Sequence, residues 1–167
     1  MSDDSSSTAG ASPFERMARS IRSGNLDLFQ EALGEYPGDP AQLLTTRDGA
    51  GATLVHLAAE YANPSLLELL LSLDPSVVKG LINQPTPTSE RATPLHLAAC
   101  PRFDDEPAAV QCVQLLLASG AVPKAKNGAG ETAIEITPYS GVRAVLAKAV
   151  AVRGSDLALD DSDGDDE

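Results

Sequence analysis

The sequence predicts an all-α protein, a solenoid of about four helix–turn–helix repeats with degenerate ends. The heptapeptide Thr-Pro-Leu-His-Leu-Ala-Ala at residues 93–99 occurs forty residues upstream, altered, as Thr-Leu-Val-His-Leu-Ala-Ala at residues 53–59. A leucine-rich run follows each copy, at residues 66–71 and 112–117. Aromatic residues make up only 4% of the chain and Trp is absent, so the core must consist of Leu, Ala and Val, which suits stacked helices.

The heptapeptide has the residue types that begin a helix and let it pack closely. Thr93 can accept a hydrogen bond from a free N–H of the first turn, and Pro94 has no N–H to leave unpaired there. Ala98 and Ala99 keep one face narrow. Helices this short are marginal alone, so each repeat must bury its apolar side against a neighbour. The pattern resembles the signature of ankyrin repeats, and the resemblance extends over residues 13–152.

The uneven charge of the chain limits its possible partners. The formal net charge is −12, and seven acidic residues lie from Asp156 onward with no basic residue after Arg153. Residues 13–153 hold 15 acidic and 12 basic residues without a basic stripe, so we expect no direct binding of nucleic acid. No apolar run approaches the roughly 18–20 residues of a membrane span, so no membrane association is expected.

The N-terminus and the cysteines indicate the compartment. The N-terminus is acidic and lacks the apolar segment of a signal peptide. Cys100 and Cys112 have neither metal-ligand spacing nor a Cys-x-x-Cys motif, which fits a reducing environment. We therefore expect a cytoplasmic protein that can also be nuclear. We expect no metal or other cofactor, and a monomer until the partner binds.

The repeats are expected to occupy the middle of the chain. The first repeat has helices at residues 13–22 and 26–33, joined by a Gly-Asn turn, and arginines at every third position give it the polar face of a terminal cap. Three segments are predicted: a disordered N-terminus at residues 1–12, an ankyrin-repeat domain at residues 13–153 and a disordered acidic tail at residues 154–167.

The connections between repeats differ in length. From the last leucine of one repeat to the threonine that opens the next, the third connection takes 15 residues, the first 20 and the second 22. The two longer connections share an Asp-Pro pair, at residues 39–40 and 74–75. The second ends in an extended, proline-containing finger loop at residues 84–91.

Repeat 3 carries six extra residues between its helices, at residues 102–107, with Phe103 inside an acidic cluster. Loops on a rigid scaffold often carry function, so this insertion is a candidate contact surface. A tolerated insertion without a function is an equally good interpretation.

The fourth repeat is degenerate. Its motif has decayed to Thr-Ala-Ile-Glu at residues 132–135, and Pro138 should end or kink the first helix early. A last helix is expected at residues 142–152, with Gly154 ending it.

No catalytic constellation is visible, and we expect the protein not to be an enzyme. His56 and His96 occupy the same position of two repeats, so a structural role, bonding the backbone of a neighbouring loop, explains both. Cys112 lies in a leucine-rich run and is expected in the core. Cys100 ends an inner helix, and the sequence places no histidine or other base beside it.

The ankyrin resemblance implies that finger loops and inner helices line a concave groove that binds another protein. Tyr61 and Tyr139 are the expected anchors, because aromatic side chains dominate interface energetics. With the insertion of repeat 3 included, the candidate partner-binding residues are Asp48, Ala50, Glu60, Tyr61, Ser89, Glu90, Arg102, Phe103, Asp104, Asp105, Glu106, Glu131 and Tyr139.

A narrower resemblance concerns the layout of the chain. Four short repeats, a long second connection ending in Leu-Ile-Asn at residues 81–83, Asn-Gly-Ala-Gly at residues 127–130 and an acidic tail are similar to the fungal Yar-type ankyrin chaperones. The insertion in repeat 3 and Leu54 in place of proline depart from that layout.

This resemblance implies a dedicated chaperone that shields a basic, KH-domain ribosomal protein of the small subunit until it joins the pre-ribosome. An acidic tail would compete with RNA phosphates for such a partner. The alternative is an ankyrin adaptor or regulatory inhibitor that recognises an apolar or neutral segment, in which case the tail only solubilises the chain.

Overall fold

The computed structural model describes residues 11–165, and every regular element within them is a helix, as predicted. Residues 1–10, most of the predicted disordered N-terminus, lie outside the described part, as do residues 166–167. The helices are α2 (Pro13–Ser23), α3 (Leu26–Gly34), α4 (Pro40–Thr45), α5 (Leu54–Glu60), α6 (Pro64–Leu73), α7 (Pro75–Leu81), α8 (Pro94–Ala99), α9 (Glu106–Ala118), α10 (Ala133–Ile136) and α11 (Ser140–Asp165).

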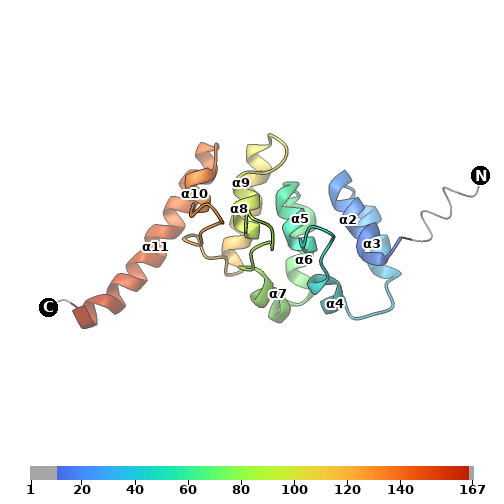
Figure 1. The fold of residues 1–167 in the computed structure, drawn as a ribbon, viewed down its shortest axis with the longest axis horizontal. Coiled ribbons are helices and arrows are strands. Elements are labelled where there is room, and N and C mark those ends of the chain that lie inside the picture. The colour runs from blue at the N-terminus through green and yellow to red at the C-terminus, as the bar shows by residue number, and fades with distance from the viewer. Residues whose placement is uncertain (1–10, 166–167) are drawn as a thin grey trace, which may run out of the picture.

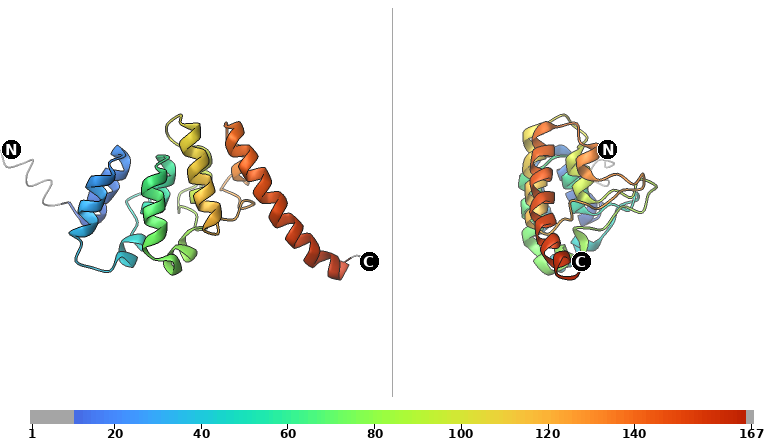
Figure 2. Two further views of the ribbon diagram at one scale, coloured as in Figure 1. Left: turned by 180° about the vertical axis from the view of Figure 1, so that it is seen from behind. Right: turned by 90° about the vertical axis from the view of Figure 1, so that its left-hand side faces the viewer.

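The helices of the four repeats form two layers. The inner helices α2, α5, α8 and α10 pack on one another in that order, and the outer helices α3, α6, α9 and α11 do the same (Figure 1). Seen along the stack, the outer helices lie on one side and long loops project on the other (Figure 2). The predicted solenoid of helix pairs is therefore confirmed.

Hydrogen-bonded caps explain how such short inner helices begin. The Thr53 hydroxyl accepts from the backbone N–H of His56 in α5, and Thr93 accepts from that of His96 in α8, both at 3.4 Å. Ser12 opens α2 with a reciprocal capping box. The threonine caps were predicted from the repeated motif, and they set the register of each inner helix.

The core is aliphatic and runs along the whole stack. Met17, Ile21 and Phe29 of the first repeat are 0% exposed. Ala58 and Ala98, in equivalent positions of α5 and α8, are also fully buried. Their small side chains let neighbouring inner helices approach closely, as the alanine pairs of the motif predicted.

Each of the two long connections contains a short helix, so the loop segments within it are shorter than the sequence suggested. Asp39 caps α4 by accepting from Ala41 N–H at 3.0 Å, and Asp74 caps α7 by accepting from Ser76 N–H at 3.1 Å. Each helix starts with the proline of the Asp-Pro pair. α4 and α7 pack against each other, so the extra residues extend the stack along the edge seen at the bottom of Figure 1.

Ala62, just after α5, adopts a left-handed backbone conformation with φ of 53°. The Asn63 N–H donates to the Ala58 carbonyl at 3.0 Å and closes this helix end. Glycine takes that conformation without the steric cost of a Cβ, so Ala62→Gly should raise the free energy of unfolding by about 1 kcal/mol in urea denaturation. The control Ala144→Gly, on the exposed face of α11, should lower it by about 0.5–1 kcal/mol. A loss of stability in Ala62→Gly would contradict the prediction.

The fourth repeat confirms one prediction and corrects another. α10 ends at Ile136, two residues before Pro138, as expected for a residue that cannot continue a helix. Gly154 was predicted to end the last helix, which is wrong, because α11 continues to Asp165. A single interior glycine costs about 1 kcal/mol relative to alanine, which weakens a helix without ending it.

Candidate functional site

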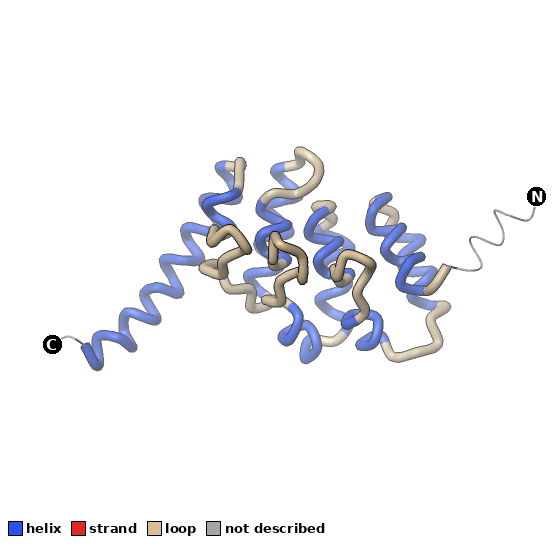
Figure 3. Tube along the Cα trace, in the orientation of Figure 1, coloured by secondary structure: helices blue, strands red, loops and turns tan. Residues whose placement is uncertain are grey.

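Three finger loops project from the inner helices and form the tan wall in front of the stack in Figure 3. We define them as finger 1 (residues 46–52), finger 2 (residues 84–92) and finger 3 (residues 121–131). The Arg47 guanidinium of finger 1 donates to the Gln84 side chain of finger 2. The Gly128 N–H of finger 3 donates to the Glu90 carbonyl at 2.7 Å. The fingers are thus joined into one continuous surface.

The two histidines anchor the fingers, as predicted. His56 Nε2–H donates to the Gln84 carbonyl at 2.9 Å, and His96 Nε2–H donates to the Glu131 carbonyl at 2.9 Å. Nδ1 of His56 accepts from the Thr53 N–H at 3.2 Å, which fixes its neutral tautomer. Burial lowers the pKa of His56 to about 4 and also lowers the pKa of His96. Both rings are therefore structural, uncharged donors near neutral pH.

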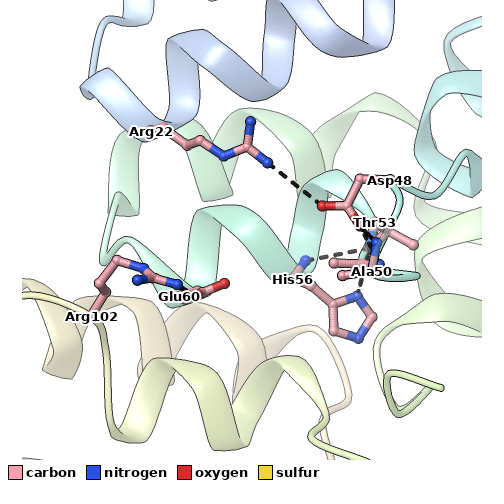
Figure 4. A network of polar contacts seen from close by, with 8 residues as sticks. Arg22, Asp48, Ala50, Thr53, His56, Glu60 and Arg102 are labelled. Atoms are coloured by element: carbon pink, nitrogen blue, oxygen red, sulfur yellow. Dashed lines mark hydrogen bonds and ion pairs between the residues drawn. The ribbon is translucent and has the colours of Figure 1, made fainter. Parts of the chain in front are cut away.

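A first hollow of about 320 Å³ lies between fingers 1 and 2 and the C-terminal ends of α5 and α8. Four of its charged side chains form two ion pairs (Figure 4): Arg22 lies 3.6 Å from Asp48, and Arg102 lies 2.5 Å from Glu60. Glu90 also lines this hollow and forms no ion pair within the described part of the chain. Five of the predicted residues other than Arg102 line it: Asp48, Ala50, Glu60, Tyr61 and Glu90. Asp48 and Glu60 therefore already have the chain's own arginines as partners.

A second hollow of about 500 Å³ lies between fingers 2 and 3, above α8. Leu97 and Ile136 supply apolar surface to it, and the exposed Glu90 and Glu131 flank it. Within the described part of the chain, neither of these glutamates forms an ion pair. Ser89, another of the candidate partner-binding residues, also lines this hollow. The second hollow therefore combines apolar contact area with carboxylates that have no internal counter-ion.

The insertion of repeat 3 is held by internal contacts on both sides. Arg102 donates from its backbone to the Glu60 carbonyl at 2.8 Å, and its guanidinium lies 5.3 Å from the centre of the Tyr61 ring. The Phe103 ring packs on Tyr61 at 5.8 Å between centroids, yet 56% of Phe103 remains exposed. Asp104 accepts from the Tyr139 hydroxyl at 3.0 Å.

The remaining acids of the insertion stabilise helix ends. Asp105 accepts from the Ala108 N–H at 3.1 Å and caps α9. Glu106 lies in the first turn of α9, not in a loop, and accepts from the Gly141 N–H at 2.7 Å at the start of α11. The predicted loop of six residues is therefore shorter, and it joins repeats 2, 3 and 4. Asp104, Asp105, Glu106 and Tyr139 line neither hollow.

Sequence reasoning missed two features of this surface. It counted Glu60 and Arg102 as separate binding residues, although they form one ion pair. It also overlooked Leu97 and Ile136, which line the second hollow from α8 and α10. Opposite charges near the ends of successive inner helices were the available signal for the ion pair.

The side chains most able to do chemistry are not grouped. Cys112 is buried, and burial raises its pKa to about 12, whereas Cys100 is exposed beside the second hollow. Among the residues that the structure describes, no three His, Cys, Asp or Glu side chains come together as a metal site would require. No helix in that part of the chain has the length and apolar character to cross a membrane.

The comparisons with known proteins agree with this geometry. A family model described as ankyrin repeats in three copies matches residues 17–127. The chain is also 34% identical over 84 residues to NF-kappa-B inhibitor delta of Homo sapiens. That match covers 50% of this chain and 25% of the inhibitor, so the chain matches about a quarter of the length of this curated relative.

Proposed function

Because the chain belongs to the ankyrin-repeat family, whose members are protein-interaction modules, we propose that its concave surface binds a basic protein and escorts it. The partner we propose is a basic ribosomal protein of the small subunit, held until ribosome assembly. The observation that supports this proposal most directly is the second hollow, where Glu90 and Glu131 flank apolar surface without an internal counter-ion.

This hollow suits a lysine or arginine side chain of the partner. Such side chains bury an aliphatic stem on apolar surface while the charged head stays near solvent. Leu97 and Ile136 would contact the stem, and Glu90 and Glu131 would accept hydrogen bonds from the head. The first hollow offers fewer unpaired carboxylates, because Arg22 and Arg102 already pair with its Asp48 and Glu60.

The acidic C-terminal segment supports the escort role through long-range attraction. Seven acidic residues follow Arg153, and they would raise the rate of encounter with a cationic protein. They would also compete with RNA phosphates, to which a basic ribosomal protein binds without sequence specificity.

A pull-down from cell extract tests the proposal, using the full chain and a chain ending at Arg153, each at low and high salt. Mass spectrometry should identify one dominant basic ribosomal protein that is lost at high salt and reduced by the truncation. Capture of a neutral protein, held equally by both chains and at both salt concentrations, would argue against the escort.

Glu90→Gln combined with Glu131→Gln should weaken binding of the captured basic partner by about tenfold, since two charge-assisted hydrogen bonds become neutral ones. Glu60→Gln is the matched control, because Glu60 already pairs with Arg102 and its loss should change the affinity less than about threefold. Isothermal titration calorimetry measures both. Equal effects of the two changes would contradict the assignment of the second hollow.

Regulatory inhibition of another protein is the second candidate function. The observation that favours it is the likeness to NF-kappa-B inhibitor delta, together with the exposed Phe103 ring packed on Tyr61. An inhibitor that recognises a neutral segment would depend on this aromatic pair. Its binding would be weakened by Tyr61→Ala and unchanged by truncation after Arg153, which is the opposite of the result expected for the escort.

A further inference from the structure

The outer helices α6, α9 and α11 lie side by side on the layer away from the fingers, and two grooves run between them (Figure 2). The α9–α11 groove has a volume of about 350 Å³, and Leu117, Val145 and Val152 give it apolar walls. The α6–α9 groove has a volume of about 280 Å³, and Pro64 and Leu115 supply apolar surface to it. Val152 is 55% exposed, so part of this apolar surface faces solvent.

Helix α9 is the ridge between the two grooves. Gln114 and Ala118 of this helix line both of them. Gln111, Gln114 and Ala118 follow a three-residue and a four-residue step, so they share one face of α9, and all three are exposed. The two grooves therefore form one continuous surface, with α9 at its centre, α6 on one side and α11 on the other. We call it the outer surface.

The two sides of the outer surface carry opposite charges. Glu68 is the charged residue of the α6–α9 groove, and Lys148 is that of the α9–α11 groove. Both side chains are exposed, and neither forms an ion pair with a side chain that the structure describes. Because both grooves reach Gln114 and Ala118, the two charges flank the same turns of α9. Each chain therefore presents an unpaired carboxylate on one side of the ridge and an unpaired ammonium group on the other.

We propose that the outer surface is the interface of a symmetric dimer of this chain. A twofold axis lying in the interface and parallel to α9 would place α9 of one copy on α9 of the other. The same rotation would place the α6–α9 groove of each copy on the α9–α11 groove of the other. Glu68 of each copy would then face Lys148 of the second copy, and this contact would form twice. The apolar walls of the grooves would cover each other.

The arrangement of the two charges favours a second copy over an unrelated protein. A surface with one unpaired charge of each sign, on opposite sides of a central ridge, is complementary to itself after half a turn. A strongly basic partner would be repelled by Lys148, and a strongly acidic partner would be repelled by Glu68. The basic protein proposed for the concave surface therefore does not fit the outer surface.

The dimer is expected to be weak, because each copy carries a formal net charge of −12. Salt at about 0.15 M screens exposed charges that are more than about 8 Å apart, which reduces this repulsion between copies. Direct pairs that are partly buried in the interface are screened less. The fingers lie on the opposite layer (Figure 2), so both concave surfaces stay free to bind protein. The dimer would replace the monomer expected from the sequence and does not depend on what the concave surface binds.

Sedimentation equilibrium of the full chain tests the proposal, from about 1 to about 300 μM at about 0.15 M salt. A reversible equilibrium between monomer and dimer is expected. Val152→Asp should weaken the association by at least about tenfold, because it places a carboxylate in an apolar contact. Val122→Asp is the matched control, since this valine is 41% exposed on finger 3, and it should leave the association unchanged.

Two charge reversals test the symmetry itself. Glu68→Lys gives each copy two positive charges at the interface, and Lys148→Glu gives it two negative ones, so each variant alone should associate at least about tenfold more weakly. An equal mixture of the two variants should dimerise again, because every charge then meets its opposite across the axis. The double variant, which carries both changes, should also dimerise. Recovery on mixing distinguishes a lost contact from a misfolded chain, since a misfolded chain would not recover.

Three outcomes would overturn the proposal. The first is a chain that remains a monomer at about 300 μM. The second is a dimer that Val152→Asp leaves at full affinity, because the interface would then lie elsewhere on the molecule. The third is a mixture of Glu68→Lys and Lys148→Glu that associates no better than either variant alone. Circular dichroism of each variant confirms that the helices remain folded.

Discussion

Acidification from about pH 7 to about pH 4 should lower the free energy of unfolding by about 3 kcal/mol through His56 alone. The ring is 0% exposed, and burial lowers its pKa from 6.5 to about 4. Its Nδ1 accepts from Thr53 and its Nε2–H donates to Gln84, so a second proton would break the Thr53 contact. The unfolded chain therefore takes up that proton more readily than the folded one.

The sign of the effect follows from the depressed pKa. Above pH 6.5 the histidine is neutral in both states, and the full stability is present. Between pH 6.5 and about 4 only the unfolded state binds the proton, so stability falls as the pH falls. His96, whose pKa is also lowered by burial, adds a loss in the same direction.

Urea denaturation at a series of pH values measures this dependence, and a histidine NMR titration assigns it. Hydrogen bonds also lower the pKa values of Asp74 and Glu135, from Ser76 and Thr132 respectively. Those carboxylates begin to lose their stabilising effect only below about pH 4.5, the ordinary pKa of Glu135, so the window above pH 4.5 isolates the histidines. A flat stability between pH 6.5 and 4.5, or a His56 ring that titrates near 6.5, would contradict the prediction.

The repeated motif predicted this histidine geometry because the contacts at one end are local. Thr53 and His56 are three residues apart, and the helical turn between them brings the hydroxyl, the backbone and the ring together. The other contact, to Gln84, joins residues 28 positions apart in the sequence. It was still predictable, because stacking of similar repeats places the backbone of each finger within hydrogen-bond distance of the preceding histidine, 2.9 Å in both cases. The residue pattern and the repeat symmetry together were therefore sufficient to predict the contacts of the two histidines.

The irregular parts were harder to predict, since no second copy constrained them. The segments of α4 and α7 were interpreted only as parts of two long connections, although Asp39-Pro40 and Asp74-Pro75 carry the capping residue and the first-turn proline of a helix. The insertion of repeat 3 was considered as a free surface because its partners, Glu60 and Tyr139, are about forty residues away in either direction. Contacts of that range depend on how the repeats stack, which a motif does not specify.

Gly128→Ala should lower the free energy of unfolding by about 3 kcal/mol, the upper part of the range for overpacking at a close contact. A Cβ at this position would lie far inside van der Waals contact of the Ser89 carbonyl oxygen, which belongs to the backbone and cannot turn aside. The neighbouring Glu90 carbonyl accepts the Gly128 N–H at 2.7 Å, so relieving the clash would also break this hydrogen bond. The change acts on the contact that joins fingers 2 and 3.

Gly49→Ala is the matched control, because Gly49 has the same place in finger 1 that Gly128 has in finger 3. No atom lies within 4 Å of a Cβ built on Gly49, so this change should leave stability within about 0.5 kcal/mol. Urea denaturation compares the two proteins. Equal stability of the Gly128→Ala and Gly49→Ala proteins would contradict the prediction, because finger 2 could then move aside without a cost in free energy. If instead only Gly128→Ala is destabilised, its loss of binding to a basic partner should exceed that of Glu90→Gln with Glu131→Gln, because separating the fingers disturbs the whole second hollow.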